Sequence, residues 1–447
     1  MARRLALRQR RMKKRDRQCE QGGRAAAGAF NRRKGTCRHS AGRRASLMTR
    51  LNIHGLGFTL FLGLLTALPP LAIDMALPSL PLIQADLHAP QTEAAAAIAI
   101  FIAGFSSAPI VVGPLADRFG RRAVMGVGLV LFTLSAAGAA LAPSIRVLLA
   151  FRLVQGASAG AVGILPRAII RDLFEGREAR LQLAAVSLVF SVAPLIAPAL
   201  GAAILFFGSW RLIFAVLTGV SVLVTLAAFA LFKESHATEN RRNLKPSTIF
   251  AGYRRALTNP ACAGFSLLGG LLFAGLFAYV NVSPLLFMQG YGVSKTGFAA
   301  LFAITASGVI VGSSINAWLL NRRVRPKTVF DAALALECLA ALALLAVGLA
   351  GLGSALVDAA LVMVFISAFG LVFPNAVHEA IHPLPEIAGL ASAVVTSTQM
   401  LFGALGGVAA AALYRDASPT ALGVIMSSAA LAGCALYAFW LRGKVEG

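Results

Sequence analysis

The sequence has 447 residues, of which 58% are hydrophobic and only 13% are charged, and its mean hydropathy is +0.76. A soluble domain averages about 25% charged residues because it needs a polar surface. This composition excludes a soluble globular protein and predicts a chain that places most of its surface in lipid.

The first 47 residues carry most of the net charge. They contain sixteen Lys and Arg residues and two acids, and so supply +14 of the formal net charge of +23. The stretch lacks an apolar segment, so it is not a secretory signal peptide. We expect it to be disordered, or to be untranslated if the start is Met48. A basic run can bind anionic lipid or nucleic acid, but we expect no nucleic-acid partner.

Twelve long apolar stretches follow. A helix needs about 20 mostly apolar residues to cross the hydrocarbon core of a bilayer. The stretches are continuous and do not alternate, so they indicate helices and not barrel strands. The sequence therefore predicts an all-α membrane protein with twelve transmembrane helices, at about 56–78, 94–115, 123–142, 146–167, 182–206, 210–232, 261–287, 297–320, 328–349, 354–377, 388–413 and 420–441.

Lys and Arg residues are unevenly distributed over the connections between these stretches. If the N-terminus is cytoplasmic, the cytoplasmic connections and the C-terminus hold nineteen of them, and the opposite side holds four. Positive residues concentrate on the cytoplasmic side of membrane proteins. We therefore predict that both termini are cytoplasmic.

The longest polar connection, residues 233–259, divides the chain into halves at 48–232 and 260–447, each with six predicted spans. In both halves the second and third spans are joined by a short basic turn, at 116–122 and 321–325. The matching halves indicate duplication. Transporters built from repeats commonly bind their substrate between the repeats, near the membrane midplane.

Residues 113–122 read Gly-Pro-Leu-Ala-Asp-Arg-Phe-Gly-Arg-Arg. This resembles the signature loop of the major facilitator superfamily, G-x-L-a-D-R-x-G-r-[KR]. Glycine permits a tight turn between helices, and an Asp can accept hydrogen bonds from a helix N-terminus or an Arg. The resemblance implies the two-bundle fold of that family and a gating loop that latches the halves on the cytoplasmic side, formed by Gly113, Asp117, Arg118, Gly120, Arg121 and Arg122.

The fourth span contains Arg152 and Gln155, followed by Gly156, and is similar to the family pattern R-x-x-q-G. A charged side chain inside a membrane is costly, so it normally faces the protein interior and has a partner. Because Arg152 lies near the outer end of its span, snorkelling to the interface is the alternative.

Shorter motifs resemble the Bcr/CflA drug-resistance group within that superfamily. Residues 73–81 (Ile-Asp-Met-Ala-Leu-Pro-Ser-Leu-Pro) are similar to its D-m-y-L-P-a-l-P pattern, and residues 167–173 are similar to its motif after the fourth span. Related patches continue to the eleventh span. Thr66 occupies a position where some related antiporters carry a second acid.

Polar and small residues recur at helical spacing on several spans. Side chains three or four residues apart share a helix face, and the resemblance implies that these spans surround a central cavity. The predicted cavity residues are Thr66, Tyr279, Ser283, Thr396 and Gln399, and Pro194, Pro198 and Gly201 form a predicted packing or hinge face on the fifth span. The alternative is that these residues only bring helices close together.

Asp74 is the strongest candidate for proton coupling. An acid within a span is a functional candidate by default, and we expect Asp74 to face Arg152, with Gln155 beside them. A permanent Asp74–Arg152 ion pair is the alternative interpretation. Glu337 is another acid deep within a span, and its sequence context indicates no role.

The sequence shows no P-loop, nucleophile elbow, dinucleotide fingerprint or metal-ligand cluster, so we predict no enzyme activity, metal or cofactor beyond the proton gradient. The five cysteines form no C-x-x-C pair. The resemblance implies proton-coupled efflux of small amphipathic drugs across the bacterial inner membrane by a monomer. A proton-coupled carrier of an amino acid, peptide or organic acid is the alternative, because a fold does not fix a function.

Overall fold

The computed structural model of the chain describes residues 55–235, 246–415 and 418–445, so the basic tail 1–47 lies outside the described part. Within those ranges, twelve helices are long and apolar enough to cross a membrane, which confirms the predicted number. Their outer faces carry large apolar side chains; Leu134, Leu223 and Leu339 are each more than 60% exposed. Such a surface suits lipid and not water.

The first half contains six spans. In chain order they are α2 (Leu56–Asp74), which continues through η1 (Leu77–Ser79) and α3 (Leu80–Asp86), then α4 (Gln91–Phe119), α5 (Arg121–Ala140), α6 (Ile145–Leu173), α7 (Gly176–Ile204) and α8 (Trp210–Leu231).

The second half also contains six. They are α10 (Pro260–Pro284), which continues as the π-helical turn η3 (Leu285–Gly290), then α11 (Lys295–Asn321), α12 (Pro326–Leu349), α13 (Ala355–Ile381), the 3-10 turn η4 (Pro385–Ile387) leading into α14 (Ala388–Leu413), and α15 (Thr420–Leu436), which ends in the π-helical turn η5 (Tyr437–Leu441).

Several helices extend past the apolar stretches predicted for them. The fifth span, predicted from residue 182, begins at Gly176, and the fourth, predicted to end at residue 167, ends at Leu173. Each predicted span ends where Arg and Glu residues begin in the sequence, because these residues are not apolar. Arg and Glu are nevertheless good helix formers. The helices therefore continue beyond the hydrocarbon core.

The first span is broken directly after Asp74. Proline has no N–H, so Pro78 cannot donate to the carbonyl of Asp74, and Pro81 cannot donate to that of Leu77. The α-helix accordingly stops at Asp74, passes through a 3-10 turn and resumes as α3. The break leaves the carbonyl of Asp74 without its usual α-helical donor.

Glycines allow the closest helix contacts in both halves. A Cβ on Gly156 of α6 would lie 1.9 Å from the carbonyl oxygen of Phe101 in α4, and one on Gly312 of α11 would lie 2.0 Å from that of Ser367 in α13. Only a residue without a side chain fits at such separations. The second and fourth spans are thus in close contact in each half.

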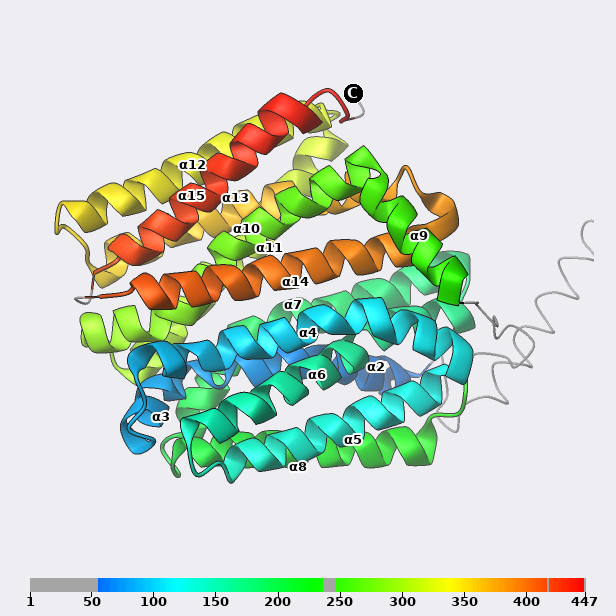
Figure 1. Cartoon of the computed structure of the whole chain (residues 1–447), viewed down its shortest axis with the longest axis horizontal. Coiled ribbons are helices and arrows are strands. Elements are labelled where there is room, and N and C mark those ends of the chain that lie inside the picture. Colours follow the sequence, from blue (N-terminus) through cyan, green and yellow to red (C-terminus); the bar gives the residue numbers. More distant parts are fainter. Residues whose placement is uncertain (1–54, 236–245, 416–417, 446–447) are drawn as a thin grey trace, which may run out of the picture.

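The two halves meet along two helix pairs, α4 with α14 and α7 with α11. Figure 1 shows α4 and α14 side by side at the centre of the molecule, with the first half below and the second half above. The linker, predicted as a polar connection, contains a helix, α9 (Pro246–Thr258), which crosses one end of this pair. At the opposite end Gln289 donates a 3.1 Å hydrogen bond to Gln84, so the halves are in contact at both ends.

Candidate functional site

Asp74 lies at the break in the first span and is 5% exposed. None of the ion pairs or hydrogen bonds found among the described residues involves its carboxylate. The fifth span packs directly against this break, since a Cβ on Gly201 would lie 2.2 Å from the carbonyl oxygen of Met75. Gly201 and its neighbour Pro198 are both buried, so this part of the predicted fifth-span face supports the site.

Arg152 points into the first half and is 1% exposed, which rules out the snorkelling alternative. Its Nε donates to the carbonyl of Ala97 and its Nη1 to that of Ala72, both at 3.1 Å. The guanidinium also lies over the ring of Phe101, with 4.4 Å from its carbon to the ring centroid. A cation over an aromatic face is stabilised electrostatically. Arg152 therefore joins α6 to the first and second spans.

Gln155 completes the arrangement one turn along α6. Its side-chain oxygen accepts a 2.7 Å hydrogen bond from Nη1 of Arg152. Two buried donors, Nη2 of Arg152 and Nε2 of Gln155, have no acceptor among the described residues. Buried donors without partners are costly. The pair can bind an incoming carboxylate or carbonyl oxygen.

Asp74 and Arg152, which we expected to face each other, are connected only indirectly. No ion pair within 4 Å joins them in the described structure, so the permanent ion pair considered from the sequence is not present. Instead, Arg152 binds the carbonyl of Ala72, two residues before Asp74 on the same helix. The acid and the cation are connected through one backbone segment.

The predicted cavity residues are mostly buried and bonded within the protein. Thr66 donates to the carbonyl of Leu62 on its own helix, and Ser283 to that of Val280. The hydroxyl of Tyr279 bonds that of Thr305 on α11 at 2.6 Å. None of the hydrogen bonds found among the described residues joins these side chains to Asp74. Of the two α14 residues, Gln399 is 4% exposed and Thr396 is half-buried.

The signature motif occupies the end of α4, the start of α5 and a single residue between them. Gly120 alone makes the turn, with φ of +98° and ψ of 155°. Gly113, expected to contribute to the turn, instead lies within α4, where an added Cβ would meet nothing within 4 Å. A left-handed φ favours glycine, so only Gly120 is required by the geometry.

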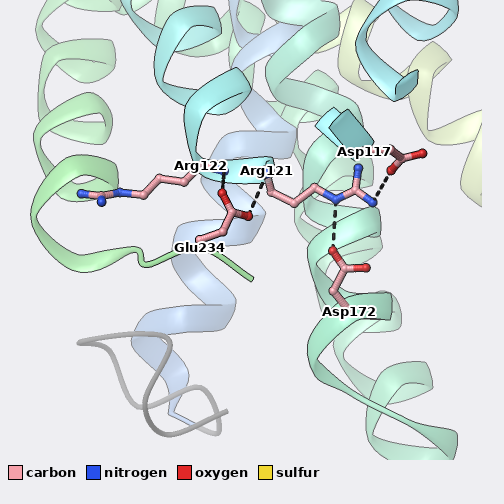
Figure 2. Close-up of polar contacts among 5 residues, drawn as sticks. All are labelled: Asp117, Arg121, Arg122, Asp172 and Glu234. Carbon is pink, nitrogen blue, oxygen red and sulfur yellow. Dashed lines mark hydrogen bonds and ion pairs between the residues drawn. The ribbon is translucent and has the colours of Figure 1, made fainter. Parts of the chain in front are cut away.

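Figure 2 shows the ion pairs around Arg121. The guanidinium bonds Asp117 on α4 at 2.7 Å and Asp172 on α6 at 3.0 Å, and its side chain is only 8% exposed. Arg121 thus ties three helices together at this end of the first half. Arg118, also predicted in the motif, is exposed and lies 5.2 Å from the ring of Phe119.

The sequence did not predict a role for Glu234. It follows the sixth span and accepts hydrogen bonds from the backbone N–H groups of Arg121 at 2.8 Å and Arg122 at 3.2 Å (Figure 2). A carboxylate at a helix N-terminus satisfies orphan donors and complements the helix dipole. Arg122 in turn donates to the carbonyl of Phe229 in α8. The sequence feature that could have indicated this contact is a single acid that follows the sixth apolar span.

The contacts drawn in Figure 2 all lie within the first half. This differs from the expectation that the motif would latch the two halves to each other. The linker helix α9 contacts both halves at this end. Its Tyr253 bonds the carbonyl of Ile110 in α4, and its Arg255 pairs with Glu386 at the start of the eleventh span.

Comparison with known sequences agrees with this architecture. The profile of the Major Facilitator Superfamily matches residues 62–407. The chain is 36% identical to an uncharacterized MFS-type transporter, YdgK of Bacillus subtilis, over 262 residues, which are 58% of this chain and 65% of YdgK. It is 29% identical to the bicyclomycin resistance protein homolog of Haemophilus influenzae, covering 80% of this chain and 90% of that protein. It is 28% identical to the multidrug resistance protein MdtL of Klebsiella pneumoniae, covering 81% and 90%.

Solved structures show the same fold at low sequence identity. The xylose transporter XylE of E. coli aligns with a TM-score of 0.65 and 14% identity, over 85% of this chain and 96% of that one. The nucleoside transporter NupG aligns with a TM-score of 0.68 and 14% identity, over 85% and 99%. The chain therefore belongs to the major facilitator superfamily of membrane transporters.

Proposed function

We propose that this transporter exports small amphipathic drugs across the inner membrane in exchange for protons, by alternating access between its two halves. The observation that carries the proposal is Asp74, a buried carboxylate at a helix break and outside the ion pairs of the described residues. Relatives named for bicyclomycin and multidrug resistance support drugs as the substrate class.

In the proposed cycle, Asp74 binds either a proton or the substrate. The unpartnered donors of Arg152 and Gln155 receive a polar group of the substrate, or the carboxylate when it has lost its proton. The bond from Arg152 to the carbonyl of Ala72 transmits the change to the first span. Each proton that enters is driven by about 2.3 kcal/mol per 100 mV of membrane potential.

The remaining elements of the proposal concern the gate. The cytoplasmic face is the end that carries the signature motif and α9, because the positive residues concentrate there. Arg121 and Glu234 hold the cytoplasmic ends of α4, α5, α6 and α8 as one rigid unit. The first half then moves as one body against the second. We expect the working unit to be a monomer that needs no cofactor besides the proton gradient.

The first test is a drug-susceptibility panel in an efflux-deficient bacterial host. We expect resistance to some amphipathic antibiotics, including bicyclomycin, loss of that resistance with Asp74→Asn, and loss of it on addition of a protonophore. Asp331→Asn is the matched control, because that carboxylate is on the surface and pairs with Arg442 at 2.8 Å. It should retain wild-type resistance.

A second measurement isolates the proton. In proteoliposomes that contain a pH-sensitive dye, addition of an exported drug should release protons with the wild type and with Asp331→Asn, and at least tenfold more slowly with Asp74→Asn. Wild-type proton release by Asp74→Asn would reject this role of Asp74. If membrane-inserted protein gives no resistance to any compound, the metabolite carrier becomes the better hypothesis.

A further inference from the structure

Two cysteines from different spans of the second half lie in contact. The sulfur of Cys338 on α12 is 3.3 Å from the sulfur of Cys434 on α15. They are 96 positions apart in the chain, so the sequence does not indicate that they meet. The S–S bond of a disulfide is about 2.05 Å long, so a small movement of the two side chains is enough to join them.

The two helices are held together on both sides of this thiol pair. At one end, Asp331 of α12 forms an ion pair at 2.8 Å with Arg442, which follows the last turn of the twelfth span. At the other end, a Cβ on Gly348 of α12 would lie 2.8 Å from the backbone nitrogen of Thr420 in α15. These contacts oppose the separation of α12 and α15, so the two thiols stay close to each other.

One of the two thiols is accessible at the outer surface of the helix pair. Cys338 is buried, but Cys434 is only half-buried. One turn before Cys434 on the same face of α15, Leu431 is 48% exposed, and Phe439 further along is 92% exposed. This surface is apolar, so it suits lipid. A reagent that dissolves in the bilayer can therefore reach the thiol pair through Cys434.

A buried acid lies beside the thiol pair. Glu337 directly precedes Cys338 on α12, is 1% exposed, and neither of its carboxylate oxygens has a partner among the described residues. The carboxylate is close enough to interact electrostatically with the sulfurs of Cys338 and Cys434. A thiol must lose its proton before its sulfur can act as a nucleophile. A carboxylate without a partner can accept that proton.

We propose that Cys338 and Cys434 are a modification site, at which an organic hydroperoxide dissolved in the membrane produces a disulfide between the ninth and twelfth spans. In the first step, the thiol of Cys434 gives its proton to Glu337, and its sulfur bonds to the terminal oxygen of the hydroperoxide. The O–O bond breaks, and the alkoxide takes the proton from Glu337 and leaves as an alcohol. Cys434 is then a sulfenic acid.

In the second step, the sulfur of Cys338 attacks the sulfur of the sulfenic acid. The S–S bond forms and the S–O bond breaks, and the leaving hydroxide takes the thiol proton of Cys338 and becomes water. The two thiols lose two electrons in all, and the hydroperoxide gains them. A thiol reductant reverses the change by thiol–disulfide exchange.

The disulfide lies within one half of the protein. Because α12 and α15 both belong to the second half, the bond does not cross the junction between the halves. The inference is therefore independent of the proposed transport cycle. A bond that closes so long a segment of the chain restricts the unfolded state, so oxidation should stabilise the second half.

Oxidation of the purified full-length protein in proteoliposomes tests the site. Cumene hydroperoxide, a lipid-soluble organic hydroperoxide, should link the two peptides that contain Cys338 and Cys434, as detected by mass spectrometry without reduction. Dithiothreitol should remove the link. The oxidised wild type should also unfold at a higher temperature than the reduced protein, because the disulfide restricts the unfolded chain.

Variants of the cysteines show whether the rise in unfolding temperature comes from this bond. Cys434→Ser should lose both the linked peptides and the rise on oxidation. Cys262→Ser is the matched control, because Cys262 is a buried free cysteine on α10 and lies outside the thiol pair, and it should retain both. The linked peptides are sought first in the unaltered chain, so a folding defect in a variant cannot hide them.

The rate of linkage tests the part assigned to Glu337. Glu337→Gln should form the disulfide about a hundredfold more slowly, the usual contribution of a positioned proton acceptor. Linkage at the wild-type rate in this variant would reject that role. If Cys338 and Cys434 of the oxidised wild type both still react with N-ethylmaleimide after denaturation, no disulfide has formed and the proposal is overturned.

Discussion

The two basic turns of this transporter look alike in the sequence and differ in the structure. In the first half, Arg121 is enclosed by two carboxylates from α4 and α6, and Glu234 caps the helix that follows. In the second half, Arg322 and Arg323 are exposed, and no carboxylate of the described residues pairs with them. Arg322 only stacks on Trp318, 4.3 Å from the ring centroid.

The comparison separates two roles that a positive turn can have. Positive charge on a connection helps to orient a membrane protein during insertion, and both turns supply it. Bracing helices against one another needs acids at matching positions, and only the first turn has them. A duplicated sequence pattern therefore does not predict a duplicated mechanical role. Substitutions in the two turns should have unequal effects.

Arg121→Met should give the largest loss of stability. It removes the ion pairs that Arg121 makes with Asp117 at 2.7 Å and with Asp172 at 3.0 Å. Breaking a fully buried pair costs about 3–5 kcal/mol. Asp117 is 37% exposed, so we expect about 2–3 kcal/mol here, seen as a lower melting temperature of the purified protein in detergent.

The matched control is Arg323→Met in the second turn, where an exposed substitution should change the free energy of unfolding by less than about 0.5 kcal/mol. Equal shifts in the two variants would show that the first turn is no more firmly braced than the second.

Gly120→Ala should have the next largest effect. Its φ of +98° with ψ of 155° lies where other residues are strained, and we expect a cost of about 1–3 kcal/mol. Gly113→Ala is the control from the same motif and should have a smaller effect. Gly113 lies within α4 without a positive φ, and an added Cβ would meet no atom of another segment within 4 Å, so only the ring of the following Pro114 opposes the change. Equal falls in melting temperature for the two variants would contradict the assignment of the turn to Gly120.

The sequence predicted the fold because the relevant signals are local. Each span is one continuous apolar stretch, so their number and approximate bounds followed directly, and Arg152 was correctly predicted to face inward. Interactions between distant segments were harder to predict. Tyr279 was placed beside the cavity from its helix position, but its hydroxyl bonds Thr305 on α11. Which neighbour a side chain meets depends on packing, which periodicity does not encode.

Glu234 is a clear example of such a distant interaction, and it yields the third prediction. The sequence shows only an acid after the sixth span, more than a hundred residues from the helix that it caps. Glu234→Ala should destabilise the protein by about 1 kcal/mol, the usual cost of losing an N-cap. Glu178→Ala, in the first turn of α7, should cost only a few tenths through the helix dipole. Thermal unfolding of the two variants side by side measures the difference.

Arg323→Gly should have the smallest effect, and it should be stabilising. Arg323 adopts φ of +59°, which costs a residue with a side chain about 1–2 kcal/mol relative to glycine. Glycine also makes the unfolded chain more flexible, which opposes the gain by about 0.5–1 kcal/mol. The net gain should be a few tenths of a kcal/mol, measured as a slightly higher melting temperature. A loss of stability would mean that the Arg323 side chain contributes a favourable interaction, and the second turn would then resemble the first more closely than the structure indicates.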